Sequence, residues 1–125
     1  FGISGVTSDM RDLRKAISEG NERAKLALDM FVYRIKKYIG SYIAALGGVD
    51  VIVFTGGIGE NVNVVRDAIC DGFECFGIKL DKSANDEAIG VERNISAKDS
   101  KVTVLAIPTD EEFMIASDTL EIVKK

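Results

Sequence analysis

The sequence predicts an α/β fold, in which helices alternate with buried strands. Two short apolar runs, 49–54 and 102–107, are rich in β-branched residues and too short for helices, which is typical of buried strands. The stretches around them carry apolar residues at steps of three and four, as helices do. This alternation favours a single α/β domain over residues 1–125. Because two strands make a poor sheet alone, we expect part of the sheet to lie outside this chain.

The first predicted helix follows a short, glycine-rich start of the chain. Thr7 or Ser8 is expected to cap it, with Asp9 in the first turn, where the helix dipole favours an acid. The helix is expected to run to about Ser18 and to stop at Gly20.

A long second helix is predicted over residues 21–46, with Asn21 as its cap and a pair of glycines after its end. Its apolar stripe predicts a main wall of the core and consists of Ala24, Leu28, Phe31, Ile35, Ile39, Tyr42 and Leu46. Three tyrosines of this helix are interpreted as core and interface residues, namely Tyr33, Tyr38 and Tyr42.

The first strand runs directly into the segment FTGGIGEN, residues 54–61, with three glycines in four positions. Glycine inside a regular element costs about 0.5–1 kcal/mol relative to alanine, so something must offset that cost. A helix is expected to begin near Gly59. Its apolar stripe, which predicts one helix up to Gly77, consists of Val62, Val65, Ile69, Phe73 and Phe76.

The rest of the chain contains one more strand and one more helix. Residues 78–80 are a candidate short strand, and 81–100 is predicted as a loop with a short strand or turn near Ile95. The strand 102–107 stops at the only proline, Pro108. A last helix, capped by Thr109 or Asp110, carries the apolar residues Phe113, Ile115, Ala116, Leu120 and Ile122.

Composition excludes several classes of protein. The net charge of −4 argues against binding of DNA or RNA by neutralisation of many phosphates, although it permits one bound nucleotide. The sequence contains no histidine, so the chain alone cannot form a histidine-based catalytic triad or metal cluster. Cys70 and Cys75 are expected to be reduced thiols, and no run has transmembrane length, so we expect a cytoplasmic protein without membrane contact.

A strand, a glycine-rich turn and a helix together form a geometry that can hold an anion or a nucleotide. The segment matches neither the Walker pattern nor GxGxxG, and such a turn is also common as plain fold geometry, so both interpretations stay open. If the two strands are parallel neighbours, Gly57–Asn61 and Asp110–Glu112 lie on the same rim. An acid at that rim could reach Mg²⁺, or it could simply be a favourable charge in the first turn of a helix.

Several segments together resemble the C-terminal third of the acetate kinase family. They are SGVTSDMRDL (4–13), VIVFTGGIGEN (51–61) followed by Arg66, GIKLD (77–81), Asn85, IS (95–96) and IPTDEEFMIASDT (107–119). The order and spacing match along nearly all of the chain. Propionate kinases are similar here and butyrate kinases are more distant.

The resemblance implies a ribonuclease-H-like domain of the actin-like ATPase type, incomplete in this chain, with a mixed sheet flanked by helices. It also implies ATP or ADP and Mg²⁺ as ligands. The residues expected to line the adenosine and phosphate side are Gly57, Ile58, Gly59, Glu60 and Asn61. The residues expected on the adenine and ribose side are Asp9, Met10 and Arg11. Glu111 matches the magnesium-associated glutamate of the family.

Three positions depart from the family pattern. The family often has alanine where Gly56 stands, which does not affect binding, and a small residue where Val62 stands, which affects packing. It often has asparagine where Asp110 stands. The extra negative charge leaves open how Asp110 and Glu111 divide the metal role.

The resemblance places the family's catalytic aspartate, histidine and arginines and its acetate pocket upstream of Phe1. We therefore expect the chain alone to have negligible kinase activity and to meet acetate and acetyl phosphate only through a missing N-terminal domain. The family dimerises largely through its C-terminal domain, so a homodimer is expected.

Two alternatives remain open, a propionate kinase relative and a nucleotide-free interaction or dimerisation module of the same fold. Arg66 is interpreted as a surface or ion-pair residue rather than a phosphate ligand, because it lies about two turns beyond the glycines.

Overall fold

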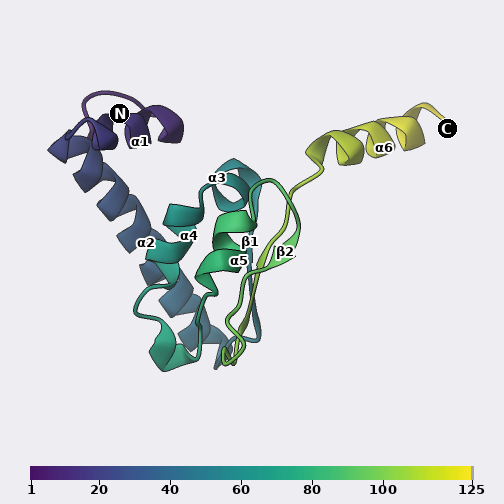
Figure 1. The fold of residues 1–125 in the computed structure, drawn as a ribbon. Helices are drawn as coiled ribbons and strands as arrows, with labels where there is room; N and C mark the ends of the chain where they lie inside the picture. The colour runs from purple at the N-terminus through teal and green to yellow at the C-terminus, as the bar shows by residue number, and fades with distance from the viewer. Residues whose placement is uncertain (125) are drawn as a thin grey trace.

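The computed structural model describes residues 1–124 and shows helices packed on a small sheet (Figure 1). In chain order, the elements are α1 (Met10–Ser18), α2 (Glu22–Leu46), β1 (Val51–Phe54), α3 (Gly56–Asn61), α4 (Asn63–Cys70), the 3₁₀ turn η1 (Glu74–Phe76), α5 (Lys82–Glu87), β2 (Arg93–Asn94), β3 (Thr103–Ala106) and α6 (Glu111–Val123). The α/β class expected from the sequence is therefore confirmed.

The sheet has three strands in the order β1-β3-β2. β1 and β3 are parallel, with Val51 opposite Thr103 and Phe54 opposite Ala106. β2 runs antiparallel to β3, and Arg93 lies opposite Ala106. The sheet is mixed, as expected, and its two long strands are parallel neighbours that end at the same edge.

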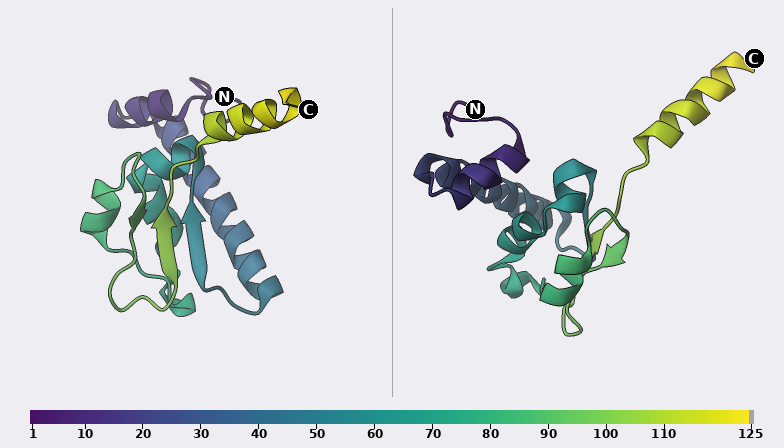
Figure 2. Two further views of the ribbon diagram at one scale, coloured as in Figure 1. Left: turned by 90° about the vertical axis from the view of Figure 1, so that its right-hand side faces the viewer. Right: turned by 45° about the horizontal axis from the view of Figure 1, so that its top comes forward.

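Helices α2 and α4 cover one face of this sheet (Figure 2). The buried core between the two layers consists of Val32, Phe54, Val62, Val65, Ile69, Cys70, Phe73, Ile78, Ala88, Ile95, Val102, Val104 and Ala106. Because side chains alternate along a strand, only every second residue of β1 and β3 can reach this core.

The other face of β1 is open. Val51 is 47% exposed and Val53 is 48% exposed, so the prediction of a buried strand over 49–54 is wrong for that face. The sequence pattern is that of a strand covered on both faces. In the described part of the chain, the helices cover only one.

The ends of α2 were predicted correctly. Asn21 accepts a hydrogen bond from the Ala24 N–H at 2.9 Å, and Gly47 ends the helix with a φ of 74°. Its buried side is narrower than predicted, because Tyr33 and Tyr42 are 64% and 62% exposed. The tyrosines are therefore surface residues of this chain and not core residues.

The predicted helix over 62–76 is interrupted. α4 ends at Cys70, Asp71 turns to an extended ψ of 129°, and Gly72 has a φ of 77°, which breaks the helix. The apolar stripe continues through the 3₁₀ turn, where Phe73 is buried. Periodicity alone could not reveal this break.

The segment 81–100 is more ordered than the predicted loop. Asp81 caps α5 by accepting from the Ala84 N–H at 2.9 Å. Just after β2, Ile95 donates its N–H to the Val104 carbonyl at 2.9 Å and is fully buried. The expected short strand near Ile95 is confirmed, whereas α5 was not predicted.

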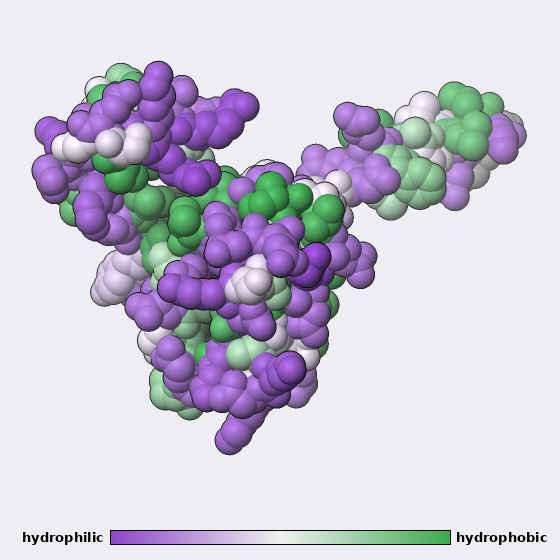
Figure 3. Space-filling model, viewed as in Figure 1, coloured by the Kyte–Doolittle hydropathy of each residue, from purple (hydrophilic) through white to green (hydrophobic). Residues whose placement is uncertain are grey.

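Helix α6 extends away from the body of the molecule (Figures 1 and 2). Asp110 caps it by accepting from the Phe113 N–H at 3.0 Å, as one of the two predicted caps. No residue of α6 is buried, and its apolar side chains form green surface in Figure 3. Among the described residues, no helix is both long and apolar enough to cross a membrane.

Candidate functional site

The glycine-rich segment forms a helix earlier than predicted. α3 begins at Gly56, with Thr55 as its cap, and not near Gly59. Gly56 has a φ of 69°, a conformation that residues with a Cβ rarely adopt. This glycine is what allows the chain to leave β1 and turn at once into α3.

The remaining two glycines of α3 have opposite surroundings. A Cβ on Gly59 would lie 3.1 Å from the carbonyl carbon of Phe54, so close packing against β1 explains this glycine. A Cβ on Gly57 would have no atom within 4 Å. Gly57 has no positive φ either. Neither the packing nor the backbone of this chain therefore requires glycine at position 57.

The structure brings two of the predicted site residues to one hollow. Met10 of α1 and Ile58 of α3 both line an open cavity of about 440 Å³ between the N-terminal segment, α1, α2 and α3. Phe31 and Arg34 of α2 also contribute to its wall. The other predicted binding residues do not line this hollow, and they are Asp9, Arg11, Gly57, Gly59, Glu60 and Asn61.

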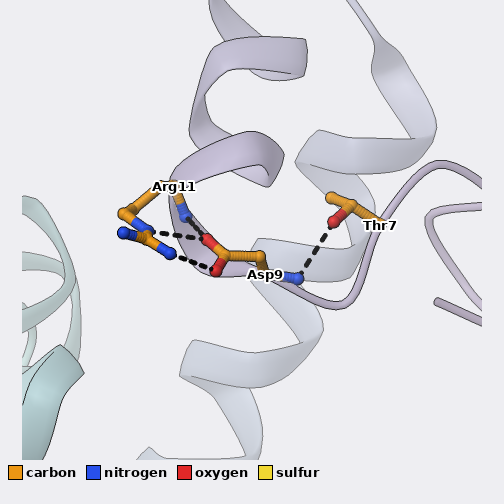
Figure 4. Close-up of polar contacts among 3 residues, drawn as sticks. All are labelled: Thr7, Asp9 and Arg11. Carbon is orange, nitrogen blue, oxygen red and sulfur yellow. Dashed lines mark hydrogen bonds and ion pairs between the residues drawn. The ribbon is translucent and has the colours of Figure 1, made fainter.

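Asp9 and Arg11 form an ion pair at the start of α1 (Figure 4). Asp9 is the cap of α1, because its carboxylate accepts from the Arg11 N–H at 2.7 Å; the prediction of Thr7 or Ser8 as the cap is wrong. Thr7 instead accepts from the Asp9 N–H at 3.0 Å and fixes the turn.

The same ion pair sets the charge state of Asp9. The Arg11 guanidinium donates to both carboxylate oxygens of Asp9, from Nε at 3.1 Å and from Nη2 at 2.8 Å. These bonds, above all, lower the pKa of Asp9 to about 2. The Asp9 carboxylate and the Arg11 guanidinium are thus held together in solvent, at the N-terminus of α1.

Glu60 joins the glycine segment to the chain that follows β3. Its carboxylate accepts from the Thr109 N–H at 2.7 Å and from the Thr109 hydroxyl at 2.9 Å. These bonds lower the pKa of Glu60. The prediction that the two segments share one rim is confirmed, since Thr109 directly precedes the predicted Asp110–Glu112.

Asn61 also bonds within the protein, since its Nδ2 donates to the Gly57 carbonyl at 3.1 Å. The side chain of Asn61 thereby holds the first turn of α3 to the last. The residue as a whole is exposed.

Glu111 is exposed at the first turn of α6. No hydrogen bond or ion pair joins its side chain to another residue within 1–124. The same residues include no group of three or more acidic, cysteine or histidine side chains that could hold a metal ion. One free carboxylate still suits Mg²⁺, which prefers oxygen ligands and is often held by one or two carboxylates together with phosphates and water.

Arg66 is neither the surface residue nor the ion-pair residue that the sequence suggested, since within residues 1–124 it forms no ion pair. Its side chain is fully buried, with 0% exposure. The guanidinium donates to the carbonyls of Gly59 and Glu60 at 2.7 and 2.9 Å, to the Asn85 side chain at 2.7 Å, and to the carbonyls of Asn85 and Ala88 at 2.8 and 2.6 Å. Burial lowers the pKa of Arg66, which still leaves it charged.

The position of Arg66 in the sequence contained a signal for its burial. It lies four residues after Val62 and three before Ile69, both of which belong to the predicted apolar stripe and are buried. The helical period therefore placed it on the buried face. The surface interpretation rested on the distance of Arg66 from the glycines and did not use this pattern.

Comparison with known proteins gives one consistent result. A family model described as "Acetokinase family" matches residues 1–117. The acetate kinase of Bacteroides thetaiotaomicron is 60% identical over 125 residues, which are 100% of this chain and 31% of that protein. The chain thus spans about a third of the length of this relative.

Two solved structures show the same similarity. The crystal structure of Porphyromonas gingivalis acetate kinase is 56% identical, with a TM-score of 0.89 over 98% of this chain and 31% of that one. A propionate kinase from Francisella tularensis is 36% identical, with a TM-score of 0.80 over 92% of this chain and 29% of that one.

Proposed function

The chain belongs to the acetokinase family, and we propose that it is the C-terminal, adenosine- and magnesium-binding part of an acetate kinase. The reaction proposed for the whole protein is ATP + acetate ⇌ ADP + acetyl phosphate. The family match over residues 1–117 and the names of the relatives support this activity. The ribonuclease-H-like, actin-like ATPase domain and the cytoplasmic location are parts of the same proposal.

The main support for a nucleotide site is the presence of glycine at position 57. Glycine in a helix costs about 0.5–1 kcal/mol relative to alanine, and neither packing nor φ offsets that cost at position 57. Gly40 of α2 has the same open surroundings, but Gly57 follows directly after β1, and ligands of α/β sheets bind at the carboxyl ends of strands. A bound group that lies against the main chain there would offset the cost. We propose that this group is the nucleotide, seated on the exposed surface of α3.

The neighbouring residues suit the parts of adenosine. Met10 and Ile58 offer an apolar, adaptable wall to a flat purine, and Met10 can adjust its shape because its side chain is flexible. The Asp9–Arg11 pair offers hydrogen-bond acceptors and donors for ribose hydroxyls. Glu60 and Asn61 hold α3 in place through Thr109 and Gly57.

The structure favours Glu111 over Asp110 as the magnesium ligand. One oxygen of Asp110 is used to cap α6, whereas Glu111 has no partner within residues 1–124. A bound Mg²⁺ would neutralise phosphate charge, and Glu111 would supply one of its oxygens.

The chemistry of transfer needs positive groups around the moving phosphoryl group. The proposal assigns these groups and the acetate pocket to the rest of the longer protein, in keeping with the length of the relatives. The chain alone is therefore expected to bind ADP but not to transfer phosphate. The homodimer is a further part of the proposal, with exposed Tyr33 and Tyr42 of α2 as candidate contacts.

A propionate kinase is the second candidate function, favoured by the similarity to the Francisella tularensis enzyme. Its TM-score of 0.80 shows that this region has the same fold in an enzyme named for a different acid. Acid-dependent kinetics of the full-length protein separate the two candidates.

The test is calorimetric titration of the chain with ADP and Mg²⁺. We expect binding by the unchanged chain and at least about tenfold weaker binding by Gly57→Val, which corresponds to about 1.4 kcal/mol. Gly40→Val is the matched control, because Gly40 also lies inside a helix with no atom within 4 Å of its Cβ position.

Two results contradict the proposal. If the Gly57→Val variant and the unchanged chain bind ADP with equal affinity, the nucleotide does not bind against the main chain of α3. Absence of ADP binding by the unchanged chain, even when mixed with an N-terminal half, would favour a nucleotide-free module of the same fold.

A further inference from the structure

We propose that Arg66 is a positioning residue that fixes the main chain of Gly57–Asn61 for the nucleotide. The inference rests on the proposed function, because it assigns that segment to the ligand. It also stands on an observation that the proposed function does not use, namely a fully buried guanidinium between two short helices.

The contacts of Arg66 are unusual for a buried charge. Within residues 1–124, no carboxylate forms an ion pair with it. Four of its five acceptors are backbone carbonyls, and the fifth is the amide oxygen of Asn85. A guanidinium has five N–H groups in a fixed plane, which matches these five acceptors.

The carbonyls belong to the C-terminal ends of two helices. Those of Gly59 and Glu60 are at the end of α3, and those of Asn85 and Ala88 are at the end of α5. The last carbonyls of a helix have no partner within the helix and carry partial negative charge. Two helix ends therefore take the place of a carboxylate as the counter-charge of Arg66.

This arrangement determines where α3 lies. The Ile58 carbonyl accepts from the Val62 N–H at 3.0 Å, and Arg66 binds the next two carbonyls. The Glu60 carbonyl also accepts from Gly90 at 3.3 Å. α3 has only six residues and few helical bonds of its own, so the bonds from Arg66 and Gly90 help to fix its end.

Asn85 completes the connection to α5. Its Oδ1 accepts from Arg66, and its Nδ2 donates to the Asn63 carbonyl at the start of α4. Asn85 is 1% exposed, so both bonds are shielded from water. Arg66 and Asn85 thus hold α3, α4 and α5 together beneath the glycine segment.

The experiment compares Arg66→Lys with the unchanged chain by amide hydrogen exchange and by titration with ADP and Mg²⁺. Lysine keeps the charge but offers one ammonium group, which cannot reach both helix ends as the planar fork does. We expect the Val62 amide at the end of α3 to exchange at least about tenfold faster, in line with loss of charge-assisted hydrogen bonds. Amides in the middle of α2, which report global unfolding, should change much less.

Arg93→Lys is the matched control. Arg93 also lies beside α5, where it pairs with the exposed Glu87 at 2.8 Å, but no hydrogen bond or ion pair joins its side chain to α3. The same arginine-to-lysine change there should leave the exchange of α3 and the ADP affinity unaltered. If Arg66→Lys does not fold, Asn85→Ala replaces it, and a selective increase of exchange in α3 is again expected.

The outcomes separate this inference from the proposed function. If the unchanged chain does not bind ADP, the proposed function fails, and the exchange data still decide whether Arg66 fixes α3. If exchange in α3 rises no more than in α2, the positioning role is refuted. If exchange rises but the ADP dissociation constant of a binding-competent chain stays the same, the link between Arg66 and the ligand is refuted.

Discussion

Two alanine substitutions in α3 test how the glycine segment is packed. Gly57→Ala and Gly59→Ala make the same chemical change two residues apart in one helix. Both remove the flexibility of glycine, which by itself stabilises a helix by about 0.5–1 kcal/mol. The surroundings should give the two variants opposite net effects.

Gly57→Ala is expected to stabilise the fold by about 0.5–1 kcal/mol, because its Cβ would have no atom within 4 Å. In Gly59→Ala, the new Cβ would lie 3.1 Å from the Phe54 carbonyl carbon, and carbon atoms prefer about 3.5–4.0 Å. Because the neighbour is backbone of β1, either α3 or β1 must move. Such overpacking costs about 1–3 kcal/mol, so the two variants should differ by about 1–3 kcal/mol.

The assay is equilibrium unfolding in urea, with the slope m compared between the variants to confirm that only stability has changed. Gly59→Ala should have the lower midpoint and Gly57→Ala the higher one, on either side of the unchanged chain. Equal midpoints, or a lower midpoint for Gly57→Ala, would refute the view that packing explains one glycine and not the other. Gly57 would then no longer indicate a bound group at α3.

Three further predictions concern charge, thiols and the last helix. The Asp9 carboxyl should titrate with a pKa of about 2 by NMR and return toward 3.8 in Arg11→Ala; because folding lowers this pKa, its stabilising effect is present above about pH 4 and is lost as the pH falls toward 2. A thiol reagent should modify the exposed Cys75 in the native chain and reach Cys70, whose pKa burial raises to about 12, only after unfolding; native modification of both would contradict this. Asp110→Ala should lower the stability of α6 by about 0.5–2 kcal/mol, seen as faster amide exchange in α6 alone, and unchanged exchange there would rule out the cap.

The elements with strong local signals were predictable from the sequence. The cap at Asn21 and the left-handed glycine at Gly47 fixed both ends of α2, and β-branched runs located β1 and β3. These features depend on residues a few positions apart. The break after Cys70 and the existence of α5 depend on contacts with distant segments, so periodicity gave the wrong length for one and missed the other.

The open face of the sheet shows a different limit. Val51 and Val53 have the composition of a strand buried on both sides, yet each is nearly half exposed in this chain. The composition of a strand indicates that both of its faces are buried, but it does not indicate whether residues of the same chain bury them. The same holds for α6, where apolar side chains such as Ile115 and Ile122 are exposed in this chain.

The candidate site likewise has a part that the sequence predicted and a part that it did not. The glycine motif is local and was found, but Asn85, which binds Arg66, is 19 residues away from it in the sequence, and Thr109, which binds Glu60, is 49 residues away. Arg66 is engaged within the protein and Arg11 is paired with Asp9, whereas Glu60 is itself negative and bonds to Thr109. Neither of these two arginines is therefore free to neutralise a phosphate.

A nucleotide on this chain would be held mainly by its adenosine part. The apolar wall of Met10 and Ile58 and the bare main chain at Gly57 favour the adenosine part, whereas the charge of the phosphates must be met elsewhere. In the proposed function, Mg²⁺ at Glu111 and groups from the rest of the longer protein meet it. We therefore expect this chain to bind adenosine and ADP with similar affinity when Mg²⁺ is absent, and to prefer ADP when Mg²⁺ is present. A strong preference for ADP without the metal would show that a cation of this chain, such as Arg34 at the hollow, already binds phosphate.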